Sequence, residues 1–94
     1  MDYWPFADPK NVAVFTVGSV WEKGRPILYV YHDEDDGARQ FHADREPDIE
    51  EASILALDEI VKLDPSIAEL TDLPLGWCAC RESQESPWVR QKMK

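Results

Sequence analysis

The sequence has no hydrophobic run long enough to cross a membrane. Its longest apolar stretches are Ala52–Leu57, which Ser53 interrupts, and Ile27–Tyr31, whereas a membrane span needs about 20 residues. The first ten residues, MDYWPFADPK, contain neither the basic region nor the apolar core of a secretory signal. These absences predict that the protein has no membrane partner and is cytoplasmic.

Cysteine is scarce, and its spacing does not favour a disulfide. Cys78 and Cys80 are two residues apart, so in a strand their Cα atoms would be roughly 6.5–7 Å apart, a poor distance for a disulfide. A zinc site would need more ligands than this pair and two distant histidines supply. We therefore expect reduced, structural thiols, with metal binding or redox chemistry as the alternative.

Catalytic and cofactor-binding motifs are also missing. None of the five serines lies in a G-x-S-x-G turn, and the chain has no G-x-G-x-x-G or phosphate-binding loop. The sequence therefore predicts no enzymatic activity, no cofactor and no metal.

Basic residues are outnumbered, and the excess of acid is concentrated. The formal net charge is −9, and residues 33–51 contain nine carboxylates against only Arg39 and Arg45, a local balance of −7 (nine minus two). Such a charge attracts basic partners and repels nucleic acid and anionic membranes. We expect a non-catalytic, acidic protein-binding module for a basic protein surface. A solvated hairpin tip whose acids prevent edge-to-edge aggregation is the alternative.

The 94 residues, 44% of them hydrophobic, are enough for a single small domain with one core. Alternating apolar and β-branched residues predict strands, and Gly37 is expected to turn a hairpin within 26–43. The predicted fold is α+β, with a mainly antiparallel sheet of four to five strands and two or three short helices. The predicted strands are 11–17, 26–32, 38–43 and 76–81, with 53–57 as a fifth. Residues 1–10 are predicted to be an irregular arm and 89–94 a flexible basic tail.

Residues 52–63 are compatible with two structures. Ile54, Leu57 and Val61 have helical spacing, and Asp48 and Glu51 are spaced as a capping box. The continuous apolar run 54–57 instead favours a short strand that leads into a helical turn. Pro65 would end any preceding helix and begin another turn.

Three motifs resemble those of a protein family. They are D-D-G-x-x-x-F at 35–41, I-L-x-L-x-x-I-x-x-L-D-P-S-I at 54–67 and L-x-x-L-P-x-G-W-x-A-x-R-E at 70–82. In this order they resemble a small bacterial domain of unknown function that is grouped with immunity proteins of polymorphic toxin systems. The resemblance implies an α+β domain in which Ser53–Leu57 is a strand before a short helix. It implies no catalytic residues, and this chain has Ala38 where the family has an aromatic residue.

Two histidines and one arginine complete the set of candidate residues. His32 and His42 could face each other across the hairpin, although a shift of one residue would separate them. With nearby acids, they define the alternative function, a small hydrolase or metal-binding protein. A calcium loop with Gly37 at its sixth position fails, because His32 and Ala43 would occupy its ends. Arg81 is predicted either to bind the partner or to have a structural role, stacked on an aromatic ring or paired with a carboxylate. The predicted partner-binding residues are Asp33, Glu34, Asp35, Asp36 and Arg81.

Overall fold

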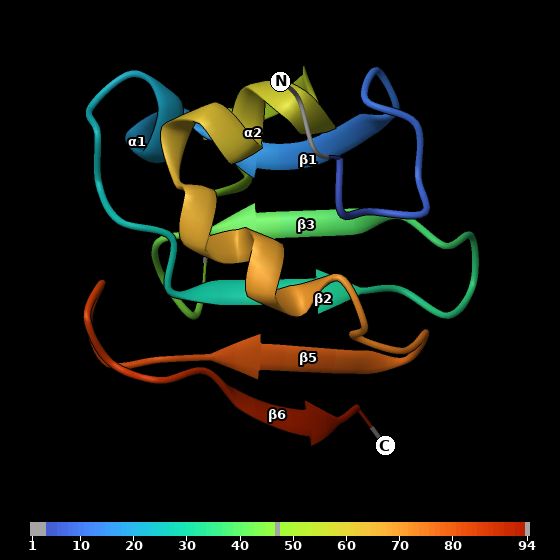
Figure 1. Cartoon of the computed structure of the whole chain (residues 1–94). Helices are drawn as coiled ribbons and strands as arrows, with labels where there is room; N and C mark the ends of the chain where they lie inside the picture. The colour runs from blue at the N-terminus through green and yellow to red at the C-terminus, as the bar shows by residue number, and fades with distance from the viewer. Residues whose placement is uncertain (1–3, 47, 94) are drawn as a thin grey trace.

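The computed structural model describes residues 4–46 and 48–93 as one mixed six-stranded sheet with short helices (Figure 1). The strand order is β4-β1-β3-β2-β5-β6. The β1–β3 pair is parallel, and the other neighbours are antiparallel. The strands are β1 (Ala13–Val17), β2 (Tyr29–His32), β3 (Arg39–His42), β4 (Ala52–Ala56), β5 (Trp77–Cys80) and β6 (Val89–Lys92). The sheet thus has more strands than the four to five that the sequence predicted.

The helical elements lie on one face of the sheet, and the core fills the space between the two layers. They are α1 (Gly18–Trp21), α2 (Leu57–Leu63) and the 3₁₀ turn η2 (Pro65–Leu70), while a second 3₁₀ turn, η1 (Ile49–Glu51), precedes β4. Figure 1 shows α2 and η2 in front of the strands. Val30 and Phe41 from the sheet and Leu57, Ile60 and Ile67 from the helical layer are at most 1% exposed. Burial of each such side chain stabilises the fold by roughly 1.5–3 kcal/mol. Packing against the helical layer therefore determines which face of the sheet is covered.

The predicted hairpin is confirmed. Strands β2 and β3 pair antiparallel, with Tyr31 opposite Gln40. At the turn, Gly37 adopts a φ of +73°, a conformation that glycine adopts without a steric penalty. The backbone N–H of Ala38 donates to Oδ1 of Asp36 at 3.0 Å, and the N–H of Gly37 donates to the carbonyl of Asp33 at 3.0 Å. The turn is therefore held by the carboxylate of Asp36 together with a backbone hydrogen bond.

Residues 52–63 form strand β4 followed by helix α2, so of the two structures that the sequence left open, the strand that leads into a helical turn is the observed one. Asp48 does not begin an α-helix. Its Oδ1 accepts from the N–H of Glu50 at 3.0 Å, at the start of η1. Helix α2 instead begins after Ala56, whose N–H donates to Oε1 of Glu59 at 3.2 Å. All five residues of β4 pair with β1.

Residues 4–10 and 89–92 were predicted as part of an irregular arm and of a flexible tail. Residues 89–92, predicted as part of a flexible basic tail, form β6 and pair with β5. That part of the sequence prediction is wrong. Residues 4–10 are irregular, as expected, but Phe6 is buried and Nε1 of Trp4 donates to the carbonyl of Asp8 at 2.7 Å. Residues 1–3, part of the predicted arm, and Lys94 lie outside the described residues.

Candidate interaction surface

The acidic segment does not form one patch. Asp33–Asp36 lie in the turn between β2 and β3, whereas the acids of residues 44–51 follow β3 at the opposite end of the sheet. The four residues of β3 separate the two groups, which at about 3.3 Å per residue is on the order of 13 Å. Two acidic loops therefore flank the sheet where the sequence indicated a single block.

Within the β2–β3 turn, the four predicted partner-binding acids have different surroundings. Oδ2 of Asp33 accepts from Nε2 of Gln40 at 2.7 Å, and Asp36 holds the turn through Ala38. Glu34 and Asp35 are exposed. All four line a shallow hollow of about 530 Å³ together with Gly76 and Met93. Glu34 and Asp35 are thus the acids that a partner could contact without disturbing the turn.

Between the acidic loops, the sheet face opposite the helices carries apolar and aromatic side chains. The strand register aligns Ile54, Phe15, Gln40, Tyr31 and Cys78 in one row across this face. Ile54 is 62% and Phe15 40% exposed. No helix of the described chain covers this face. The sequence analysis did not predict that Phe15 and Ile54 are exposed. The alternation along 13–17 gave one signal, because it places Val14 and Phe15 on opposite faces of the strand.

A second hollow adjoins the same face near the C-terminal strand. It measures about 570 Å³ and is mostly apolar, with Tyr29, Pro87 and Val89 among its lining residues. The guanidinium of Arg45 lies 5.6 Å from the ring centroid of Tyr29, within the range of a cation–π contact. The helix-free face therefore combines exposed apolar area with a hollow at its edge.

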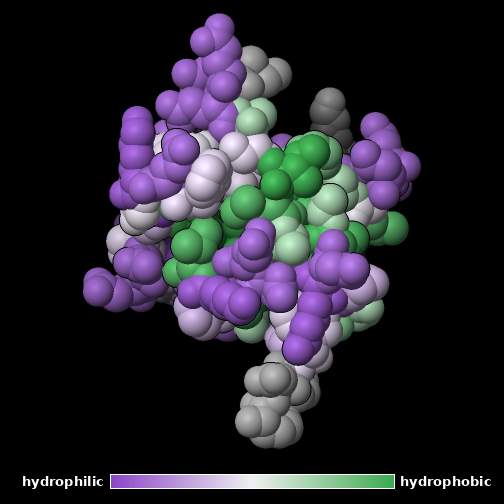
Figure 2. Space-filling model, turned by 90° about the horizontal axis from the view of Figure 1, so that it is seen from above, coloured by the Kyte–Doolittle hydropathy of each residue, from purple (hydrophilic) through white to green (hydrophobic). Residues whose placement is uncertain are grey.

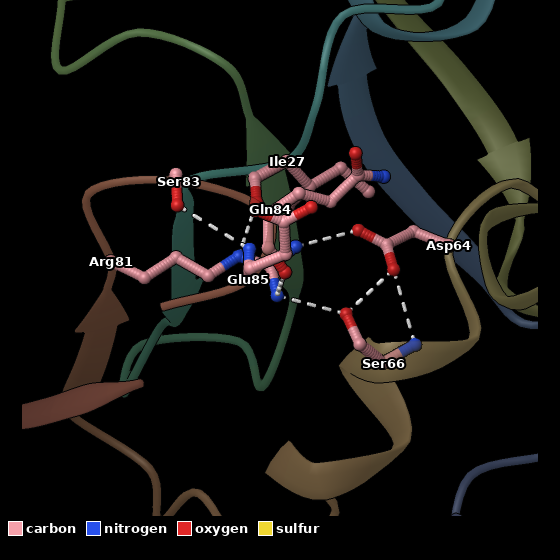
Figure 3. A network of polar contacts seen from close by, with 7 residues as sticks. All are labelled: Ile27, Asp64, Ser66, Arg81, Ser83, Gln84 and Glu85. Atoms are coloured by element: carbon pink, nitrogen blue, oxygen red, sulfur yellow. Dashed lines mark hydrogen bonds and ion pairs between the residues drawn. The ribbon is translucent and has the colours of Figure 1, made fainter. Parts of the chain in front are cut away.

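Arg81 is not available to a partner. Its side chain is 2% exposed and its Nη2 donates to Oδ2 of Asp64, itself 8% exposed, at 2.7 Å. The same guanidinium donates to the carbonyl of Ile27 and the hydroxyl of Ser66 (Figure 3). Its Cζ lies 4.0 Å from the ring centroid of Trp88. The structural alternative for Arg81 is the observed one, and both of its forms are present: the guanidinium stacks on Trp88 and pairs with Asp64. The burial removes Arg81 from the candidate partner-binding residues.

The two histidines lie on opposite faces of the sheet. His32 is opposite Arg39 and His42 is opposite Tyr29, which is three residues away from the register in which the two histidines would face each other. Nδ1 of His32 donates to the carbonyl of Leu73 at 2.7 Å on the helical side. Among the described residues, no group of three or more His, Cys, Asp or Glu side chains could hold a metal ion. The His32/His42 site proposed as the alternative is therefore not formed.

His42 is buried on the helix-free face with an incomplete set of hydrogen bonds. Its Nε2 lies 2.9 Å from Oε1 of Gln40, an acceptor, so Nε2 carries the proton in the neutral ring. Its Nδ1 has no hydrogen-bond partner within the described chain. Burial lowers the pKa of His42 below its usual 6.5, and the charge of Asp33 opposes this only in part. The neutral ring is therefore the favoured form in the folded protein.

The cysteines point to the helix-free face, as their spacing indicated. Both are free thiols, with Cys78 opposite Tyr31 and Cys80 opposite Tyr29. Burial raises the pKa of the Cys78 thiol, and the neighbouring Cys80 adds to the effect. A raised pKa leaves less thiolate, the nucleophilic form, at neutral pH. This environment is that of a structural thiol.

Comparisons with protein-family models, with curated proteins and with solved structures found no match for the chain. The resemblance to the immunity-associated bacterial domain thus stays a prediction from three sequence motifs. The case for function rests on the surfaces of this molecule. Among the described residues, no helix is long and apolar enough to cross a membrane.

Proposed function

We propose that the protein is a non-catalytic binding module that uses its acidic loops and its helix-free sheet face to hold a basic protein. The observation that carries the proposal is the arrangement of charge and apolar area. Exposed Phe15 and Ile54 lie on the sheet face, and an acidic loop lies at each end of β3. Specific interfaces have the same anatomy, an apolar centre within a polar rim.

The sign of the charge defines the chemistry of the partner. A net charge of −9 favours encounter with a basic surface and opposes binding to nucleic acid. The motif resemblance supports a toxin or a nucleic-acid-handling protein as the class of partner, because such proteins present basic surfaces. The acidic loops would then act mainly on the rate of association and on its salt dependence.

The acidic turn is best tested with two substitutions. Glu34→Lys with Asp35→Lys reverses the two exposed acids and leaves the bonds of Asp33 and Asp36 in place. The matched control is Glu69→Lys with Glu85→Lys, which makes the same charge change at two exposed residues outside the acidic segment. Each variant is immobilised and used for capture from a lysate of the native host at low and at high salt.

We expect wild type and control to retain the same basic protein at low salt and to lose it at high salt. The turn variant should capture severalfold less at low salt. If no basic protein is retained, or if the turn variant and the control behave alike, the acids serve solubility alone and the proposal fails.

A further inference from the structure

The two edges of the sheet differ in how they are protected. An edge strand presents unpaired backbone groups, and proteins commonly guard it with charged residues. Edge strand β6 contains Arg90 and Lys92. Edge strand β4 is Ala-Ser-Ile-Leu-Ala and contains no charge and no proline. The view onto the β4 side of the sheet shows hydrophobic residues gathered in the middle and hydrophilic ones around them (Figure 2).

The hydrogen-bond register leaves backbone groups of β4 free. The N–H of Leu57 donates to the carbonyl of Val12 at 2.9 Å, and the β1–β4 register continues from this pair. Because antiparallel pairs alternate between bonded and non-bonded positions, Leu55 and Ser53 direct their N–H and C=O groups toward β1. The backbone N–H and C=O groups of Ile54 and Ala52 point away from β1, toward the open edge of the sheet. Both residues are exposed.

The surroundings of β4 favour a basic strand. Glu50 and Glu51 precede it, and Asp58 and Glu59 follow it. Beside its first residues, a hollow of about 290 Å³ is lined by Trp21, which is 40% exposed, by the two preceding glutamates, and by Glu22 and Lys23. The strand thus has an uncharged centre, an aromatic wall at one end and acids at both ends.

We infer that β4 is a site of β-strand addition for an extended segment of a partner protein, with apolar residues at its centre and Lys or Arg at both ends. Main-chain hydrogen bonds to Ile54 and Ala52 would provide affinity, and the acids would select the flanks. A second copy of this chain is a poorer occupant. Antiparallel pairing of two β4 strands about Ile54 would place Glu50 and Glu51 of one copy beside Asp58 and Leu57 of the other, with like charges facing. The inference rests on the proposed function for the sign of the partner's charge.

The test uses the peptide Lys-Lys-Val-Thr-Val-Thr-Val-Lys-Lys, with a version carrying Glu in place of each Lys as the charge control. Ile54→Pro removes one outward N–H and keeps the ladder to β1. Lys92→Pro is the matched control, because the bond from the N–H of Met93 to Gly76 directs the N–H of Lys92 away from β5. Circular dichroism verifies that both variants fold, and fluorescence polarisation gives the affinities.

We expect the Lys peptide to bind wild type and Lys92→Pro equally, and to bind Ile54→Pro at least tenfold more weakly. The Glu peptide should not bind. Hydrogen exchange on the wild-type protein provides a second measurement that needs no variant, since the peptide should slow exchange of the Ile54 amide and leave that of Lys92 unchanged. Absence of Lys-peptide binding, equal weakening in both proline variants, or an unchanged Ile54 exchange rate would overturn the inference.

These outcomes are separable from those of the proposed function. The Glu34→Lys, Asp35→Lys variant alters the β2–β3 turn and should bind the Lys peptide within twofold of wild type. If the Lys peptide does not bind the wild-type protein but the turn variant still captures less of the basic partner, only the β4 site is refuted. If the Lys peptide binds but the turn variant captures as much partner as its control, the acidic-turn function is refuted and the strand-addition site is retained.

Discussion

At the scale of single residues, the buried Arg81–Asp64 pair holds together segments that are far apart in the sequence. It connects β5, the segment before β2 and the start of η2 through one guanidinium. Removing one member of a buried ion pair costs roughly 3–5 kcal/mol, because the other charge stays buried without a partner. Arg81→Ala should therefore lower the free energy of unfolding by several kcal/mol, as measured by urea denaturation.

The exposed pair Arg90–Asp72 provides the contrast for this prediction. Its side chains are 40% and 70% exposed, and such pairs contribute at most about 1 kcal/mol. Arg90→Ala should change stability far less than Arg81→Ala. Similar losses for the two variants would show that Arg81 does not carry the structural role assigned to it.

A second prediction at this scale concerns His42 and pH. Because the folded state lowers the pKa of His42 below 6.5, the unfolded chain binds its proton at a higher pH than the folded one. The stability associated with the neutral ring is complete above pH 6.5 and is lost as the pH falls from there toward the lowered pKa. His42→Phe retains an aromatic ring beside Tyr31 but cannot titrate, so its free energy of unfolding should decline less steeply below pH 6.5. Urea denaturation across this range measures both slopes, and equal slopes would contradict the assignment.

At the scale of elements, the sequence predicted strands correctly where buried and exposed side chains alternate. It did not predict a strand that forms through backbone pairing alone. Strands β1, β2, β3 and β5 lie inside the predicted ranges because buried residues such as Val30 and Ala79 recur with period two. Strand β6 is exposed at every position, so nothing in its side chains signals a strand. It forms because β5 offers an unpaired edge. The placement of β1 between β3 and β4 is likewise a long-range event that local patterns do not encode.

The pairing of β6 with β5 leads to a prediction for hydrogen exchange. The register and the Met93–Gly76 bond place the N–H groups of Val89 and Gln91 toward β5 and those of Arg90 and Lys92 toward solvent. Exchange measured by NMR should therefore be slow at Val89 and Gln91 and fast at Arg90 and Lys92. Uniformly fast exchange across 89–92 would instead support the sequence prediction of a flexible tail.

At the scale of the whole molecule, the chain's charge is distributed differently from its sequence order. The segment 33–51 is continuous in sequence, but β3 runs through it and carries its two acidic parts to opposite ends of the sheet. The positions of the acids can be read from the sequence. The apolar face between them cannot, because it is formed by strands that are far apart in the sequence. Ile54 and Phe15 become neighbours only through the β1–β4 register.

The same distribution predicts how the protein behaves as its charge is neutralised. At neutral pH, the net charge of −9 and the acids beside β4 keep copies apart. Near the sequence pI of about 4.5, this repulsion vanishes and the uncharged β4 edge can pair with that of another copy. Sedimentation should therefore show a monomer at pH 7 and larger species near pH 4.5. Ile54→Lys should suppress them by placing a charge on the edge, whereas Val89→Lys, at a similarly exposed position of β6, should not. Equal association of the two variants would mean that assembly does not proceed through β4.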